Sequence, residues 1–270
     1  APVNTLHNSV RNWVRWVIRN LDTGKPHHGW LAWWVAVVTP SLLVCGVHWL
    51  LVWSLGWIAA GVWSVVILYA TLGFRQFSHH FTGIRDALHA GDEELARQRL
   101  AEWMRIDASA LPRSEIVRHV IEYSVLSAHR HVFGVFAWYS LLAALGLGPA
   151  GAVLYRVSEF VARYVNRAVS PSGTPVSQAL QDNANAAWAA MDWLPARVTA
   201  LGFAFVGSFE EAVDSWRQQE ALFPGDNDGV ILAATAGAVN VKLGPKEGNS
   251  PGQTPQPVHL RAVVGLVWRT

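Results

Sequence analysis

An acid, a proline and a base lie close together in Met191–Arg197, which reads Met-Asp-Trp-Leu-Pro-Ala-Arg. We place this stretch at a membrane boundary, where charged side chains are costly and are expected to pair or to face a polar cavity. Two interpretations of Asp192 and Arg197 stay open, a structural ion pair and a ligand site. Arg118 and Glu122 lie four residues apart on one predicted helix, a spacing that also suits a simple surface pair.

Histidine is the other residue type here with versatile chemistry. Three clusters fall at predicted membrane boundaries: His27-His28, His79-His80, and His129 with His131. Metal binding is one interpretation, although no carboxylate lies at the spacing of an HExxH-like motif. Interfacial or helix-capping histidines are the alternative, and we predict no metal site. The single cysteine, Cys45, excludes a paired-cysteine zinc site. Phosphate-loop, dinucleotide-glycine and Gly-x-Ser-x-Gly motifs are absent from the sequence.

The elements that must position these residues are predicted to be membrane helices. The chain is 51% hydrophobic and 15% charged, against about a quarter charged in soluble domains. It has 15 tryptophans, a residue that gathers at membrane interfaces. No Asp, Glu, Lys or Arg occurs in Gly29–Phe74, about twice the roughly 20 residues of one crossing. We expect a helical hairpin, with Leu31–Trp53 running out and Leu55–Phe74 running back.

Two further apolar regions follow. Val132–Tyr155 is uncharged and long enough to cross, with an interruption expected near its far end at Gly146, Gly148, Pro149 and Gly151. Val198–Phe205 needs Ala184–Leu194 to make a fourth span. Arginines at positions 11, 15 and 19 indicate an amphipathic helix on an anionic leaflet, with 1–29 and 75–131 on the cytoplasmic side.

The fold class that we predict is all-α, a multi-pass helical membrane protein with a cytoplasmic helical domain between membrane helices. Its segments are 1–29, an interfacial amphipathic helix; 30–74, a transmembrane hairpin; 75–131, a cytoplasmic helical segment; 132–206, transmembrane or interfacial helices; 207–243, cytoplasmic or interfacial helices; and 244–270, a Gly/Pro-rich linker and the start of a further apolar helix. We expect both chain ends to be cut or incomplete. The predicted location is a bacterial inner membrane, and the net charge of +2 argues against nucleic acid as a partner.

Local signals divide the charged segments into helices. In 75–131 the apolar spacing predicts three helices, the first ending near Gly91, the second capped by Asp92 and the third starting at Ser114. Ser208 and Glu211 have the spacing of a capping box, which predicts a helix start. The small apolar run Val230–Val241 is also expected to be helical.

Several strings together resemble the CobD/CbiB superfamily of membrane proteins, which also includes the AmpE proteins. In the family's order they are Gly91–Arg97, Asp107 through Glu122, Gly148–Arg156, Trp193–Thr199 and Asn227–Gly244. The Pro-Ala-Arg and Gly-Pro-Ala-Gly strings within them are the most specific.

The resemblance implies an enzyme of cobalamin biosynthesis. Members of the family join aminopropanol phosphate to adenosylcobyric acid in an ATP-dependent amide formation that gives adenosylcobinamide phosphate. It implies a corrinoid as substrate, and ATP and Mg²⁺ as cofactors. We assign catalytic roles to Glu122, Asp192 and Arg197. Substrate-binding roles follow for His80, Arg118, Arg156 and Asn227, and no residue is assigned to a metal.

The chain also departs from the family pattern. Tyr123–His131 stands where the biosynthetic enzymes carry two acids and an amide, and Trp188-Ala189 replaces an acid pair. Whether the chain is an enzyme therefore stays open. The alternative is an AmpE-like, non-catalytic membrane signalling modulator, and a weaker one is a scaffold whose cytoplasmic helices hold a partner enzyme. Expected partners are the lipid bilayer, and other membrane enzymes or further copies of the chain.

Overall fold

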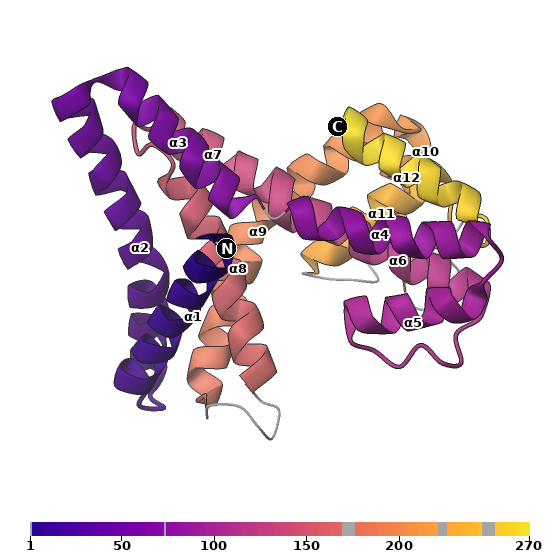
Figure 1. The fold of residues 1–270 in the computed structure, drawn as a ribbon, viewed down its shortest axis with the longest axis horizontal. Coiled ribbons are helices and arrows are strands. Elements are labelled where there is room, and N and C mark those ends of the chain that lie inside the picture. Colours follow the sequence, from indigo (N-terminus) through magenta and orange to yellow (C-terminus); the bar gives the residue numbers. More distant parts are fainter. Residues whose placement is uncertain (1, 73, 169–175, 221–225, 245–251) are drawn as a thin grey trace. The chain divides into compact units, whose positions relative to one another are not determined.

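The computed structural model describes residues 2–72, 74–168, 176–220, 226–244 and 252–270 (Figure 1). Within these ranges the regular elements are helices, apart from an isolated bridge between Val241 and Gln253. The all-α class is therefore confirmed. The helices form two compact units, the first made of residues 1–72 and 133–193 and the second of residues 73–132 and 194–270.

The first unit begins with three helices, α1 (Pro2–Leu21), α2 (Pro26–Leu55) and α3 (Trp57–Thr71). Gly56 joins α2 to α3 with a φ of 85°, a left-handed conformation that glycine adopts without strain. The predicted hairpin is thus present as helix, turn and helix. Of the helices in the described ranges, α2 is the one long and apolar enough to cross a membrane, and α3 is a shorter apolar helix of 15 residues.

The third apolar run differs from the single span that the sequence predicts. Val132–Tyr155 folds as α7 (Gly134–Ala144) and the start of α8 (Ala150–Ala168), after a π-helical turn, η1 (His129–Phe133). The interruption expected from the glycines is real, with φ values of 79° at Gly146 and 56° at Gly148. It is a complete turn, and α8 packs back against α7.

The core of the first unit lies at one end of α2. α1 runs back along α2, and the Trp13 Nε1 donates a hydrogen bond to the Ala36 carbonyl oxygen at 3.1 Å. The buried cluster takes residues from α1, α8 and the start of α9 (Gln178–Val206), but from α2 only residues up to Val37. Its buried members are Val14, Val17, Ile18, Ala32, Trp33, Ala36, Val37, Val157, Val161, Val165, Leu180, Ala184 and Ala187.

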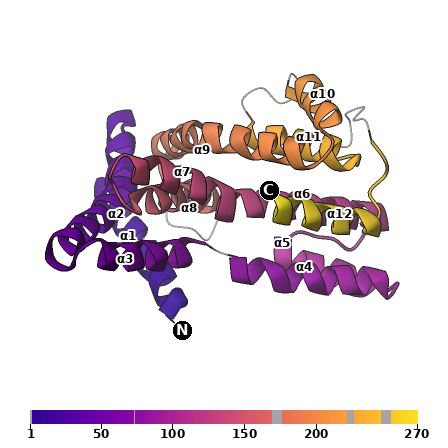
Figure 2. The ribbon, with the colours of Figure 1, turned by 90° about the horizontal axis from the view of Figure 1, so that it is seen from above.

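The second unit contains the three helices predicted for 75–131, namely α4 (Phe74–His89), α5 (Glu93–Met104) and α6 (Arg113–Ala128). The Asp92 side chain caps α5 by accepting from the Leu95 backbone N–H at 3.0 Å, as its position predicts. The later part of α9 from residue 194, α10 (Phe209–Glu220), α11 (Asn227–Val239) and α12 (Pro257–Arg269) complete this unit. α6 is the central helix of this unit's packing, because it contacts α4, α5, α11 and α12 (Figure 2).

Two helix starts follow the sequence. α10 begins directly after Ser208, and α11 covers most of the small apolar run predicted as a helix. Residues 245–251 of the predicted linker lie outside the described residues. The apolar helix expected after it is α12, whose inward side chains Leu260, Val263 and Leu266 are buried.

Close packing of α7 and α8 depends on Gly151. A methyl group there would lie 2.0 Å from the Trp138 carbonyl oxygen, so Gly151→Ala must push the helices apart. We expect a loss of about 1–3 kcal/mol, the usual range for overpacking, measured as a lower unfolding temperature in detergent. Gly61→Ala on α3 is the matched control, because no atom lies within 4 Å of its added methyl. Equal stability of the two variants would contradict the close packing.

The start of α12 predicts a pH dependence. The His259 Nδ1 accepts the Gln256 backbone N–H at 3.0 Å, which requires an unprotonated nitrogen, and burial lowers the pKa of His259 below its ordinary value of 6.5. This group therefore contributes stability above pH 6.5 that is lost as the pH falls through the lowered pKa. His259→Gln keeps an acceptor at the capping-box position and does not titrate. We expect the wild-type unfolding temperature to fall relative to that of the variant between pH 7.5 and pH about 5. Parallel curves would show that His259 is not the titrating group.

Candidate functional site

Arg118 and Glu122 on α6 hold the segment that follows α11. The Arg118 Nη1 lies 3.1 Å from the Glu122 Oε1 and donates to the Gly244 carbonyl oxygen at 2.7 Å. The Glu122 Oε1 accepts the Gly244 backbone N–H at 2.9 Å. Glu115 adds a second carboxylate, 2.7 Å from the Arg118 Nη2. We call these four residues the Arg118 clasp.

The clasp is half-buried and electrostatically satisfied. The side chains of Arg118 and Glu122 are 13% and 15% exposed, so this is not the solvated surface pair that the spacing alone allows. Burial acts to lower the pKa of Arg118, but the hydrogen bond to Glu115 and the charge of Glu122 outweigh it and raise the pKa above its ordinary value. The guanidinium stays charged, and both carboxylates are already engaged by a cation.

A second polar group surrounds the first turn of α11. The Arg197 Nη1 donates to the Asn227 Oδ1 at 3.1 Å, and Arg130 in η1 pairs with Asp228. Asp226 caps the helix by accepting the Asp228 backbone N–H at 3.0 Å. The start of α11 therefore contacts η1, after the end of α6, whereas Gly244 beyond the end of α11 contacts the first half of α6. α11 thus runs antiparallel to α6. We call this group the α11 entry cluster.

The histidines serve different roles. His129 is fully buried, and its Nδ1 lies 2.9 Å from the Thr199 Oγ1, while the His131 Nδ1 bonds the Ser127 carbonyl oxygen at 2.9 Å. His80 is exposed and stacks on Trp103, with ring centroids 5.8 Å apart. In the described ranges no group of three His, Cys, Asp or Glu side chains could hold a metal ion.

Asp107, another position that matches the family pattern, caps its own turn. Its carboxylate accepts hydrogen bonds from the hydroxyl and the backbone N–H of Ser109, and these hold the pKa of Asp107 below its ordinary value. This arrangement gives Asp107 a local structural role.

In the first unit, Asp192 and Arg156 lie in separate interactions. The fully buried Asp192 Oδ1 accepts the Tyr155 hydroxyl at 2.7 Å. The Arg156 Nη1 lies 2.8 Å from the Glu159 Oε2, and the Arg163 Nε lies 2.6 Å from the Glu159 Oε1. Glu159 is buried between the two arginines, at a position where the family pattern has an asparagine.

The seven predicted site residues thus fall into several groups. Arg118 with Glu122, and Arg197 with Asn227, are brought into contact in the second unit, and His80 belongs to that unit at the Trp103 stack. Asp192 and Arg156 belong to the first unit. Sequence reasoning missed Arg130 with Asp228 and His129 with Thr199. The latter pair is 70 residues apart, and only the His129–His131 cluster hinted at it.

These features define an all-α protein that combines one apolar helix long enough to cross a membrane with a charged helical unit. Within that class, the chain belongs to the CobD/Cbib protein family, whose model matches residues 2–257. The resemblance stated from the sequence strings is therefore confirmed.

Three relatives illustrate the match. A cobalamin biosynthesis protein CobD from Stutzerimonas stutzeri is 30% identical over 262 residues, which cover 91% of this chain and 79% of the relative. Proteins of the same name from Chromobacterium violaceum and Leptospira interrogans are 31% and 30% identical over 67% and 71% of this chain. The chain spans 54% and 59% of the length of these two. No solved structure matches.

The Arg118 clasp predicts a large local effect of substitution. Arg118→Gln leaves two half-buried carboxylates without their cation, so we expect a loss of about 3 kcal/mol and faster hydrogen exchange of the Gly244 amide. Arg85→Gln, which removes an exposed pair with Asp86, is the control and should cost at most about 1 kcal/mol. Unchanged exchange at Gly244 in Arg118→Gln would show that the clasp does not hold this segment.

Proposed function

We propose that the chain is a membrane enzyme of cobalamin biosynthesis that joins aminopropanol phosphate to adenosylcobyric acid. Membership of the CobD/Cbib family over residues 2–257 supports the pathway, as do the names of the three relatives. The proposed location is a bacterial inner membrane with more than one crossing. The uncharged α2–α3 hairpin supports it, because lipid excludes ionised side chains.

The hydrogen bond from Arg197 to Asn227 is the observation that best supports the proposed reaction. It joins the Pro195-Ala-Arg197 string to Asn227-Asp-Gly229, two strings that match the family pattern and lie 30 residues apart. Arg130 joins the same helix end through Asp228. Aminopropanol phosphate and ATP both carry phosphate groups, and guanidinium groups bind phosphate through paired, charge-assisted hydrogen bonds. We assign Arg197 and Arg130 to binding and orienting a phosphate group of a substrate.

We assign Glu122 a positioning role, a revision of the catalytic role expected from the sequence. Its carboxylate already accepts from Arg118 and from the Gly244 N–H, so it is poorly suited to take a proton from the attacking amine. Through Gly244 it instead anchors the C-terminal side of the α11 region, whose other end carries the α11 entry cluster.

The amide bond forms between the amine nitrogen of aminopropanol phosphate and a carboxyl carbon of the corrinoid. One carboxyl oxygen leaves with the phosphoryl group taken from ATP, and the amine releases a proton. A hard cation such as Mg²⁺ prefers uncommitted carboxylates. Glu115 and Glu122 are engaged by Arg118, and Glu159 by two arginines, so these described carboxylates do not fit a magnesium site.

The AmpE-like modulator is the second candidate. The same engaged carboxylates favour it, together with Tyr123–His131 in place of acidic residues. A modulator would leave the corrinoid unchanged and would not bind ATP with Mg²⁺ at micromolar concentrations. These two outcomes separate it from the biosynthetic enzyme.

The direct test incubates full-length protein, purified in lipid, with adenosylcobyric acid, ATP, Mg²⁺ and aminopropanol phosphate. We expect adenosylcobinamide phosphate to form. Arg197→Gln should lower kcat/KM about 10- to 100-fold, the loss of one or two charge-assisted hydrogen bonds. Arg217→Gln, at an exposed arginine of α10, should stay close to the wild type. Absence of product with the wild-type protein would overturn the enzyme proposal.

A further inference from the structure

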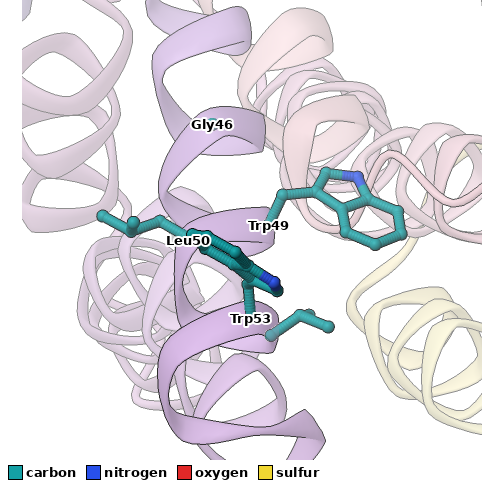
Figure 3. A pocket seen from close by; sticks show the side chains of 5 residues that line it. Gly46, Trp49, Leu50 and Trp53 are labelled. Carbon is teal, nitrogen blue, oxygen red and sulfur yellow. The ribbon is translucent and has the colours of Figure 1, made fainter.

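The second half of α2 and all of α3 present a large exposed apolar surface. Trp53 is 91% exposed and Ile58 is 87% exposed, on either side of the Gly56 turn. Figure 3 shows Trp49, Leu50 and Trp53 projecting from α2 beside Gly46, around a shallow apolar hollow. Other exposed apolar residues of these two helices are Leu42, Leu43, Val47, Leu55, Trp57, Val62, Val65, Val66 and Tyr69. A soluble protein rarely exposes so large a continuous apolar surface.

The first half of α2 has a different environment. α1 returns along it, and the Trp13–Ala36 bond fixes the register. Arg11 lies two residues from Trp13 on α1, toward the later part of α2, so its Cα lies only about 3 Å beyond the level of Ala36. Arg15 and Arg19 lie on the other side of Trp13, beside earlier residues of α2. These three arginines are therefore placed next to the part of α2 before Pro40.

α8 places further charged residues beside the part of α2 before Pro40. His48 of α2 lies against Gly148, just before α8 begins, and the later residues Val157, Val161 and Val165 share the buried cluster with Ala32–Val37. α8 therefore runs antiparallel to α2. Its Arg156–Glu159–Arg163 group, in which Glu159 is buried and both arginines are partly exposed, lies on this portion, beside the first half of α2.

The charge of the neighbouring helices and the exposure of the α2 side chains therefore change together near the middle of α2. Before Pro40 the helix is packed by α1, α8 and α9, which carry ionised residues. From Ser41 onward its neighbours are α3 and the α7–α8 turn, through the Trp63–Val44 and Trp49–Gly146 hydrogen bonds. No Asp, Glu, Lys or Arg occurs in residues 41–72 or 133–155. Ionised side chains are costly in hydrocarbon, so this division sets the depth to which the unit can enter a bilayer.

We propose that the hydrocarbon layer begins at Ser41, so that lipid chains cover the second half of α2 and the outer faces of α3 and α7. This inference rests on the membrane location proposed above and starts the span at Ser41, where hydropathy predicts a start at Leu31. Trp30 and Trp34 then lie in the headgroup layer, a preferred site for tryptophan, beside the arginines of α1. Each hairpin helix contributes about 22 Å, less than the roughly 30 Å of a bilayer core, so the bilayer thins locally around the hairpin.

Site-directed spin labels test this depth. In a Cys45→Ser parent, single cysteines replace Leu31, Leu50 or Val65, whose side chains are 49%, 60% and 66% exposed and therefore tolerate a label. Each labelled full-length protein is placed in anionic vesicles, and its accessibility to oxygen is compared with that to a water-soluble nickel chelate. We expect labels at Leu50 and Val65 to favour oxygen by at least about tenfold over the nickel chelate, and Leu31 to favour nickel.

Leu31 and Leu50 form a matched pair, being two leucines of similar exposure on one helix. A label at Leu31 as deep as that at Leu50 would overturn the proposed depth while leaving the membrane location intact. Nickel access at both Leu50 and Val65 would overturn the proposed depth and the membrane location together. Neither result bears on the cobalamin reaction, which the product assay tests separately.

Discussion

The cost of placing an ionised side chain in hydrocarbon is the constraint on which the first unit depends. α2 carries no Asp, Glu, Lys or Arg, yet its two halves have different neighbours. The arginines of α1 and the Arg156–Glu159–Arg163 group accompany the first half, whereas the second half has uncharged neighbours. Hydropathy alone treats α2 as uniform. Its neighbours change at Pro40, and we propose that lipid covers the second half of α2 while the first half lies at the membrane surface.

The second unit is organised by arginines that bind chain segments distant in sequence. Arg118 reaches Gly244 across 126 residues, Arg130 reaches Asp228 across 98, and Arg197 reaches Asn227 across 30. The three contacts fix α11 against α6 and the end of α9. The Arg118 clasp holds one end of α11, and Arg130 and Arg197 lie near the other end, each paired with a side chain of the helix start. Because Arg197 and Asn227 belong to strings that match the family pattern, we propose phosphate binding for this second group and positioning for the first.

Local sequence signals predicted the elements well and the contacts between them poorly. The uncharged run predicted the hairpin, Asp92 predicted the start of α5, and the glycines from 146 to 151 predicted the break between α7 and α8. These features depend on residues within a few positions of one another. The partner of Asp192 did not follow in this way, because Tyr155 lies 37 residues away on another helix. Arg197 likewise bonds Asn227, 30 residues away, a contact that no local signal indicated.

We propose that the chain performs the amide-forming step that converts adenosylcobyric acid into adenosylcobinamide phosphate. Growth of a cobalamin-requiring strain that lacks the gene tests this most directly, because it places the block between two supplied corrinoids. The account predicts growth on adenosylcobinamide and none on adenosylcobyric acid, with growth on the latter restored by the intact gene. Equal growth of the deletion strain on both corrinoids would contradict it.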